Sequence, residues 1–203
     1  MIDFPKAKQY IINLLESDLN KGFLYHDLAH TLDVFKSATK LGEMAQLEVH
    51  DLLLLKTAAL YHDVGLIYTT IGHEQKGLEI VKEILPGFGY SPQDIKIIGD
   101  IILATQVPQN PKNQLEELLC DADLDYLGRD DFFILAAKLQ LEWRRLKVKD
   151  ISFDEWLLFE KGFLAQHKYF TPQARELRDK GKQDNLDQIK NICKKHHMLN
   201  AEE

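Results

Sequence analysis

The sequence predicts an all-α fold that forms one domain over residues 1–203, and three observations support this prediction. Nearly every periodic segment repeats its apolar residues at helical spacing, every three or four positions. Helix start signals recur, as at Ser91-Pro92 and Thr171-Pro172, where an N-cap residue precedes a proline at the first helical position. The chain has no long alternating β-branched run, no glycine-rich phosphate loop and no internal repeat.

The first half of the chain supplies five of the predicted helices. The third contains the apolar run 52–60, which has the composition of a buried helix, and it ends at the pair His62-Asp63. Gly65, two residues beyond the pair, is expected as the C′ residue that ends this helix. The five helices are expected over residues 6–19, 27–46, 52–63, 73–85 and 92–105.

The second half of the chain supplies four more predicted helices. A loop that contains two prolines, residues 107–111, separates the two halves. Ser152 and Glu155 have the spacing of a capping box and predict a helix start. The helices are expected over residues 115–127, 130–147, 152–167 and 172 to the end. In the helix over 130–147, the expected buried residues are Phe132, Phe133, Leu135, Ala136, Leu139 and Trp143.

Composition and charge argue against several classes of protein. Hydrophobic residues make up 45% and charged residues 28% of the chain, as in ordinary globular proteins. The net charge of −7 argues against a general nucleic-acid binder. Cys120 and Cys193 lack the spacing of a disulfide framework or of a thiolate zinc site. No apolar segment reaches the roughly 18 residues that span a bilayer, and the N-terminal segment lacks the apolar stretch of a signal peptide. We expect a cytoplasmic protein that binds neither membranes nor nucleic acid.

Side chains of metal-ligand type recur within these apolar helices. His26 and His30 are four residues apart, so they share one face if both are helical. His62 and Asp63 are adjacent, and burying such a carboxylate costs several kcal/mol unless a cation or hydrogen-bond donors meet it. A further pair, His73-Glu74, opens another predicted helix, where an acid is favourable to the helix dipole. Each pair alone could also be an exposed surface feature.

Three acids alternate within the predicted helix over residues 115–127. Asp121 and Asp125 share one face of such a helix, and Asp123 lies across from them. At least one of these acids should therefore face the interior, where it needs a cation or donors. In the alternative interpretation, Asp121 and Asp125 are solvated and Asp123 caps a helix end.

The order His30, His62-Asp63, Asp123, with helices between these residues, resembles the HD superfamily of metal-dependent phosphohydrolases. In that family an all-helical bundle presents a His, a His-Asp pair and a distant Asp to one divalent cation. The resemblance covers a motif core of about residues 20–130. The segment 163–175 is similar to the helical C-terminal extension of predicted HD phosphohydrolases from bacteria, so we assign about residues 130–203 to such an extension. The implied fold is a multi-helix bundle like those of HD domains and phosphodiesterases.

The resemblance also implies roles for individual residues. His30, His62, Asp63 and Asp123 are the implied ligands of one divalent metal ion: Mn, Fe, Co, Ni, Zn or Mg. The stretch that begins at His26 is similar to one in cyclic-nucleotide phosphodiesterases, and this similarity implies that His26 protonates the leaving oxygen. Asp63, or otherwise Asp123, is a candidate for accepting a proton from the attacking water.

The chain departs from the binuclear members of this superfamily. Gly72-His73-Glu74 matches one of their two further histidines, but Thr105 stands where the second would be. We therefore expect one metal ion, with His73 either as a substrate contact or as a residue that supports a metal ligand from behind. Lys76 and Arg129 are candidate phosphate-binding residues, because a cation near the site would stabilise a phosphate.

The sequence therefore predicts a metal-dependent phosphohydrolase, either a phosphomonoesterase or a phosphodiesterase, that uses a metal-activated water. Its expected substrate is a small phosphoester, and a nucleotide or cyclic nucleotide is the expected class. The alternative is a non-catalytic helical module that senses nucleotides or binds a partner, with a structural metal whose four protein ligands close the coordination sphere. A homodimer is expected only from the general frequency of such assemblies.

Overall fold

The computed structural model describes residues 1–19 and 21–196, and within these ranges it contains helices and no β-strand. The prediction of an all-α fold is therefore confirmed. The chain forms two compact units, residues 1–21 with 26–124 and residues 22–25 with 125–203. That both belong to one functional domain stays a prediction. None of the described helices is long and apolar enough to cross a membrane.

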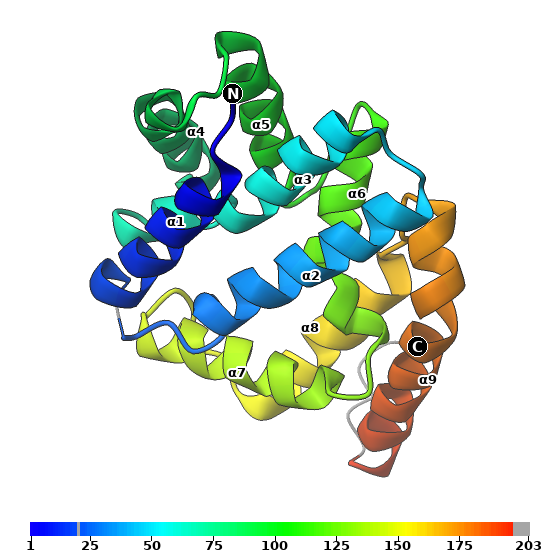
Figure 1. Cartoon of the computed structure of the whole chain (residues 1–203). Coiled ribbons are helices and arrows are strands. Elements are labelled where there is room, and N and C mark those ends of the chain that lie inside the picture. Colours follow the sequence, from blue (N-terminus) through cyan, green and yellow to red (C-terminus); the bar gives the residue numbers. More distant parts are fainter. Residues whose placement is uncertain (20, 197–203) are drawn as a thin grey trace. The chain divides into compact units, whose positions relative to one another are not determined.

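The first unit is built around helix α3, which packs against α1, α2, α5 and α6 (Figure 1). Seven residues of α3 are buried: Leu54, Leu55, Thr57, Ala58, Ala59, Leu60 and Tyr61. The apolar run therefore forms the buried helix that its composition predicts. The elements of this unit are α1 (Phe4–Asp18), α2 (Leu28–Met44), α3 (Val49–Tyr61), the 3₁₀ turn η1 (Val64–Ile67), α4 (His73–Ile84), the 3₁₀ turn η2 (Leu85–Phe88), α5 (Pro92–Ala104) and α6 (Gln114–Asp123).

Gly65 has a different role from the one that its position predicts. Helix α3 ends at Tyr61, and Gly65 lies inside η1 without a positive φ angle, so it is not a C′ residue. A Cβ atom at Gly65 would collide with the backbone carbonyl of His73 at the start of α4. Glycine is needed here because two backbone segments approach closely.

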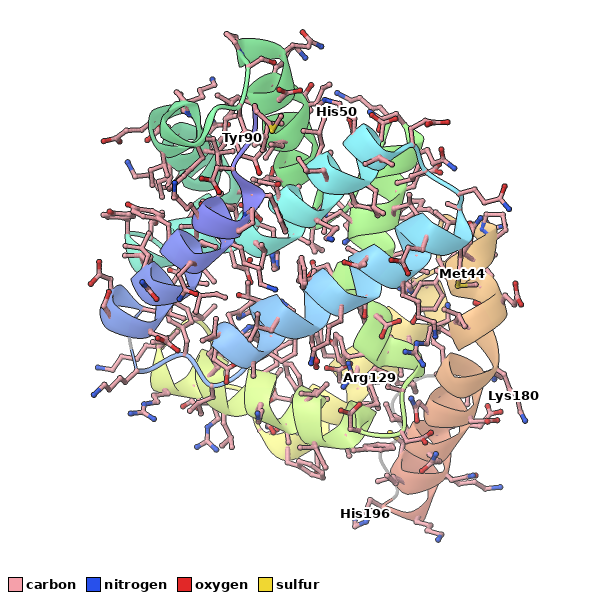
Figure 2. The ribbon with its side chains drawn as sticks, viewed as in Figure 1. Met44, His50, Tyr90, Arg129, Lys180 and His196 are labelled. Atoms are coloured by element: carbon pink, nitrogen blue, oxygen red, sulfur yellow. The ribbon has the colours of Figure 1, made fainter. Side chains whose placement is uncertain are left out.

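The capping signals at the start of α5 are confirmed. The Ser91 hydroxyl accepts the backbone N–H of Asp94, while the Asp94 carboxylate accepts the backbone N–H of Ser91. His50, at the start of α3, brings its Nε2 to 2.8 Å from the same carboxylate (Figure 2). Tyr90, also labelled in Figure 2, has its hydroxyl 2.8 Å from that of Thr57. These contacts join the start of α5 to α3.

The second unit contains the turn η3 and three longer helices. The predicted helix starts at Ser152 and Thr171 are confirmed, since both side chains accept a backbone N–H of the first turn. Residues 197–203, at the end of the last predicted helix, lie outside the described residues. The elements are η3 (Asp125–Gly128), α7 (Phe132–Arg145), α8 (Phe153–Gln166) and α9 (Pro172–Lys195).

Helix α7 buries a different set of residues from the one expected. Phe132 and Ala136 are buried, whereas the other four expected residues are half-buried. Glu142 is instead almost fully buried. Its burial is tolerated because its carboxylate accepts the backbone N–H groups of Leu24 and Tyr25, each at 2.8 Å. A polar residue was not expected at this position, since its partners lie far away in the chain.

We predict that Gly65→Ala destabilises the protein by about 1–3 kcal/mol, because its methyl group forces η1 and α4 apart. The free energy of unfolding from urea titrations measures this change. Gly87→Ala is the matched control, since a Cβ at Gly87 meets no atom within 4 Å. Equal stability of the two variants would contradict the close approach.

We also predict that Glu160→Gln stabilises the protein at pH 8 more than at pH 5. Burial raises the pKa of Glu160 from 4.5 to about 7, and its Oε2 has no hydrogen-bond partner among the described residues. The unfolded chain releases this proton near pH 4.5 and the folded chain near pH 7, so stability is lost as the pH rises through this window.

The advantage of Glu160→Gln over the wild-type protein should grow by about 2 kcal/mol between pH 5 and pH 8, as urea titrations at both values would measure. Glu176→Gln, on the exposed side of α9, is the control. An advantage of the same size at both pH values would show that Glu160 does not titrate in this window.

Candidate metal centre

His62 follows the last residue of α3 and turns one ring nitrogen toward the helix itself. Its Nδ1 lies 2.9 Å from the backbone oxygen of Ala59, which can only accept, so Nδ1 carries a proton. The Nε2 atom of the neutral ring therefore keeps its lone pair and points away from the helix. This is how a metal-binding histidine is usually oriented.

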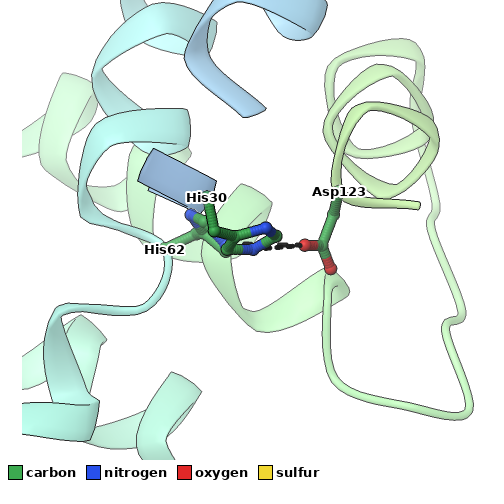
Figure 3. Close-up of side chains that lie close together, drawn as sticks. All are labelled: His30, His62 and Asp123. Carbon is green, nitrogen blue, oxygen red and sulfur yellow. Dashed lines mark hydrogen bonds and ion pairs between the residues drawn. The ribbon is translucent and has the colours of Figure 1, made fainter. Parts of the chain in front are cut away.

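Three further side chains converge on this nitrogen. The His62 Nε2 atom lies 3.1 Å from Oδ2 of Asp63, 3.3 Å from Nε2 of His30 and 3.5 Å from Oδ1 of Asp123. The His30 Nε2 atom lies 3.3 Å from Oδ1 of Asp123 and 3.5 Å from Oδ2 of Asp63. Figure 3 shows the two rings directed toward the Asp123 carboxylate. The structure thus brings together all four residues that the sequence singled out as ligands.

The spacing and chemistry of these atoms fit a divalent metal ion. Metals such as zinc bind nitrogen and oxygen ligands at about 2.0–2.2 Å, so neighbouring ligand atoms of a tetrahedral site lie about 3.4 Å apart. Ligand atoms of His30, His62 and Asp123 all lie within 4.8 Å of one another. The buried Oδ2 atom of Asp63 has no hydrogen-bond partner among the described residues. An acceptor left in this state is what a bound cation would satisfy.

The electrostatics of the cluster also call for positive charge at its centre. Burial favours the neutral form of Asp63, but His62 and His73 outweigh it and hold the pKa of Asp63 well below its ordinary value. Burial opposes protonation of His62, yet Asp63 and Asp123 raise the pKa of His62 well above its ordinary value. The pKa of Asp123 is lowered by His30 and His62 against the effect of burial. Both carboxylates are therefore ionised, and either ring protons or a metal ion must balance them.

His30 lies in the first turn of α2, where Asp27 is the N-cap. The Asp27 carboxylate accepts the backbone N–H of His30 at 2.9 Å. His26 precedes this cap and is not helical, so the condition under which His26 and His30 would share one helix face is not met. Their rings nevertheless lie edge to face, with centroids 5.6 Å apart. An Asp just before an apolar periodic run is the signal that could have identified the cap.

The three alternating acids do not lie on one continuous helix. Helix α6 ends at Asp123, and the turn η3 begins at Asp125, so the expected sharing of a face by Asp121 and Asp125 does not apply. Asp121 and Asp125 are buried rather than solvated, and Asp123 is half-buried among the histidines. The expectation of an inward-facing acid is met.

His73, the first residue of α4, lies on the other side of the Asp63 carboxylate. Its Nε2 atom is 3.4 Å from Oδ1 of Asp63 and 3.6 Å from Glu74, and its Nδ1 atom is 3.3 Å from the backbone oxygen of Thr70. Burial opposes protonation of His73, but Asp63 and Glu74 raise its pKa. The Thr105 hydroxyl donates to the backbone oxygen of Ile102 in its own helix. Asp63 is thus held between two histidines.

The two candidate phosphate-binding residues already have partners. The Lys76 Nζ atom lies 2.8 Å from Glu79 and 5.4 Å from the centre of the Tyr68 ring. Lys76 is three residues after His73 on α4 and therefore lies on the same side of this helix. Arg129 belongs to the second unit, where its guanidinium pairs with Asp131 at 2.6 and 2.9 Å.

Solved structures of similar fold include proteins from three bacterial sources. YpgQ from Bacillus subtilis, solved in complex with ADP, is 18% identical over 95% of this chain and 94% of its own, with a TM-score of 0.66. A predicted HD superfamily hydrolase from an uncultured Thermotogales bacterium is 18% identical over 94% and 91%, with a TM-score of 0.56. A Lactobacillus plantarum protein is 18% identical over 95% and 98%, with a TM-score of 0.64. At these identities the similarity shows a common fold.

Comparison with curated proteins finds no match. The HD domain family model, in contrast, matches residues 27–130, about half of the chain. These residues contain His30, His62, Asp63 and Asp123, the four groups that converge in the structure. The sequence match therefore identifies this chain as a member of the HD domain family.

Proposed function

We propose that this protein is a phosphohydrolase that uses one divalent metal ion to hydrolyse a small phosphoester. The observation that carries the proposal is the convergence of two imidazole nitrogens and two carboxylate oxygens, with nitrogen-to-ligand distances of 3.1–3.5 Å. When bound, the ion supplies Lewis-acid chemistry, since it lowers the pKa of bound water and offsets charge on phosphoryl oxygens. Membership of the HD domain family supports this general class of reaction.

His30, His62, Asp63 and Asp123 are the proposed ligands. Mixed nitrogen and oxygen ligation suits Mn, Fe, Co, Ni or Zn, and Mg is a further candidate. Asp63 is also the proposed catalytic carboxylate, because it is ionised and half of its carboxylate faces the metal ligands. It can accept a proton from the attacking water. His73 holds the second oxygen of this carboxylate and, as a half-buried residue, can also contact the substrate.

His26 is the proposed general acid for the leaving oxygen. Its ring lies beside that of His30, but no atom of His26 belongs to the group of converging ligand atoms. The His26 side chain is half-buried, so a substrate bound at the metal can reach it. A protonated imidazole at this place would stabilise the alkoxide that leaves as the bond to phosphorus breaks.

A nucleotide or cyclic nucleotide is the proposed class of substrate. The similarly folded YpgQ was solved in complex with ADP, and this supports a nucleotide-sized ligand. Lys76 is the proposed phosphate contact, because it lies on the same side of α4 as His73 and next to the exposed Tyr68 ring. That Arg129 binds phosphate stays a prediction. A homodimer stays a prediction.

We predict that His62→Ala and Asp63→Ala each weaken Mn²⁺ binding by more than about 100-fold, because each removes a direct ligand. Both variants should also lose metal-stimulated release of p-nitrophenol from phosphoesters. Titration with Mn²⁺ followed by electron paramagnetic resonance measures binding separately from turnover. His50→Ala, an exposed histidine paired with Asp94, is the control and should bind Mn²⁺ like the wild-type protein.

Two outcomes would contradict the proposal. Unchanged Mn²⁺ binding in both ligand variants would exclude this metal site. A metal-loaded wild-type protein that hydrolyses no phosphomonoester, phosphodiester or cyclic nucleotide would exclude the enzyme, and would favour a binding module with a structural metal.

We predict that His26→Ala lowers kcat for a nucleotide substrate by about 10²–10⁴-fold while Mn²⁺ binding stays within about twofold of wild type. The loss should be much smaller for a p-nitrophenyl ester, because p-nitrophenolate leaves without being protonated. Steady-state kinetics on the two substrates check this difference. An equal loss on both would show that His26 is not the general acid.

A further inference from the structure

Tyr68 is a large aromatic residue that the first unit leaves exposed. Tyr68 is 64% exposed, and Ile71, three residues later, is 88% exposed. Single exposed apolar residues are common on protein surfaces, but these two share one short loop, residues 68–72. The loop runs from the end of η1, which follows Asp63, to the start of α4, which opens with His73. It therefore connects two elements that meet at the candidate metal centre.

Hydrogen bonds fix the start of this loop. The backbone N–H groups of Tyr68 and Thr69 both donate to the backbone oxygen of Gly65, at 2.9 and 3.0 Å. The Thr69 hydroxyl donates to the backbone oxygen of Ile71 at 2.9 Å and accepts the N–H of Ile71 at 3.2 Å. The Tyr68 ring is therefore presented from an ordered backbone, and a ligand that binds it has less entropy to overcome.

Two side chains connect the candidate metal ligands to the Tyr68 ring. Nε2 of His73 lies 3.4 Å from Oδ1 of Asp63. Lys76 follows His73 by three residues, so the two side chains are neighbours on one side of α4. The Nζ atom of Lys76 lies 5.4 Å from the centre of the Tyr68 ring. All four residues belong to the first unit, and they form a row that begins at a metal ligand and ends at an exposed ring.

The Lys76 ammonium can bind a phosphate while it keeps its place over the ring. Its partner Glu79 lies 2.8 Å away, but both side chains are exposed, and such an ion pair adds little stability. A phosphate can therefore replace Glu79 at low cost. The ammonium lies on one side of the Tyr68 ring, and the exposure of Tyr68 leaves the opposite face for a planar group. The loop 68–72 contains no charged residue, which suits contact with an uncharged base.

We propose that the Tyr68 ring stacks on the base of a nucleotide whose phosphate lies at the metal centre and Lys76. Tyr68 is then the residue that favours nucleotides over phosphoesters without an aromatic ring. Every base has a flat face, so stacking selects this class without specifying one base. This inference rests on the proposed phosphohydrolase function and assigns its preference for nucleotides to one side chain.

AMP and ribose 5-phosphate test the proposal, because AMP carries the same sugar and phosphate and adds only the base. Their inhibition constants are measured against Mn²⁺-stimulated release of p-nitrophenol from a phosphoester, where substrates and inhibitors compete alike. The wild-type protein should bind AMP more tightly than ribose 5-phosphate. Tyr68→Ala should weaken AMP binding by about 5–150-fold, the range expected for the loss of one stacked base. Its affinity for ribose 5-phosphate should stay within about twofold of wild type.

Two further variants separate stacking from a structural effect. Tyr68→Phe keeps the ring and should retain AMP binding within about twofold of wild type. Tyr10→Ala removes another exposed tyrosine of the first unit, on α1, and should leave both inhibition constants within about twofold of wild type. Electron paramagnetic resonance of bound Mn²⁺ checks the metal site of each variant.

Three results would overturn the stacking role alone. These are equal affinity of the wild-type protein for AMP and ribose 5-phosphate, unchanged AMP binding in Tyr68→Ala, and equal weakening of both ligands in that variant. The last of these would show that Tyr68 only supports the loop. A wild-type protein that binds no Mn²⁺ or releases no p-nitrophenol would instead overturn the proposed function, and the stacking role with it.

Discussion

The structure of the first unit depends on one buried carboxylate, that of Asp63. Its ionised form is held between His62 on one oxygen and His73 on the other, in surroundings where an isolated charge would cost several kcal/mol. The carboxylate thereby ties the end of α3 to the start of α4. The close approach of Gly65 to the His73 carbonyl belongs to the same junction. A fixed arrangement of backbone and charge is what a metal centre needs before its ion arrives.

The sequence predicted those features whose cause lies within a few neighbouring residues. The pair His62-Asp63 stood out because an apolar run leads directly into a carboxylate, and burying it requires a partner. Capping signals at Ser91 and Ser152 were equally local, and the structure contains both capping boxes. The convergence of His30 and Asp123 on the pair could be expected only from the resemblance to a family, since spacing alone does not specify how helices pack.

Other features had no local signal. Arg178 is 53 residues from Asp125, and Glu142 is 118 residues from Leu24, so neither contact leaves a pattern in a short window of sequence. Gly65 was assigned to a helix end because that is the commonest use of a glycine there, while its actual neighbour is a carbonyl on the next helix. The start of the turn η3 at Asp125 also had no local signal, because η3 is held by contacts with the distant helix α9.

The carboxylate of Glu142 has a consequence for the order in which the chain folds. It accepts the amide hydrogens of Leu24 and Tyr25, directly before His26, across a separation of 117–118 residues. Closing so long a loop is entropically costly and cannot occur until the ribosome has released that part of α7. The stretch that carries the proposed proton donor is therefore completed late in synthesis, after most of the first unit has emerged.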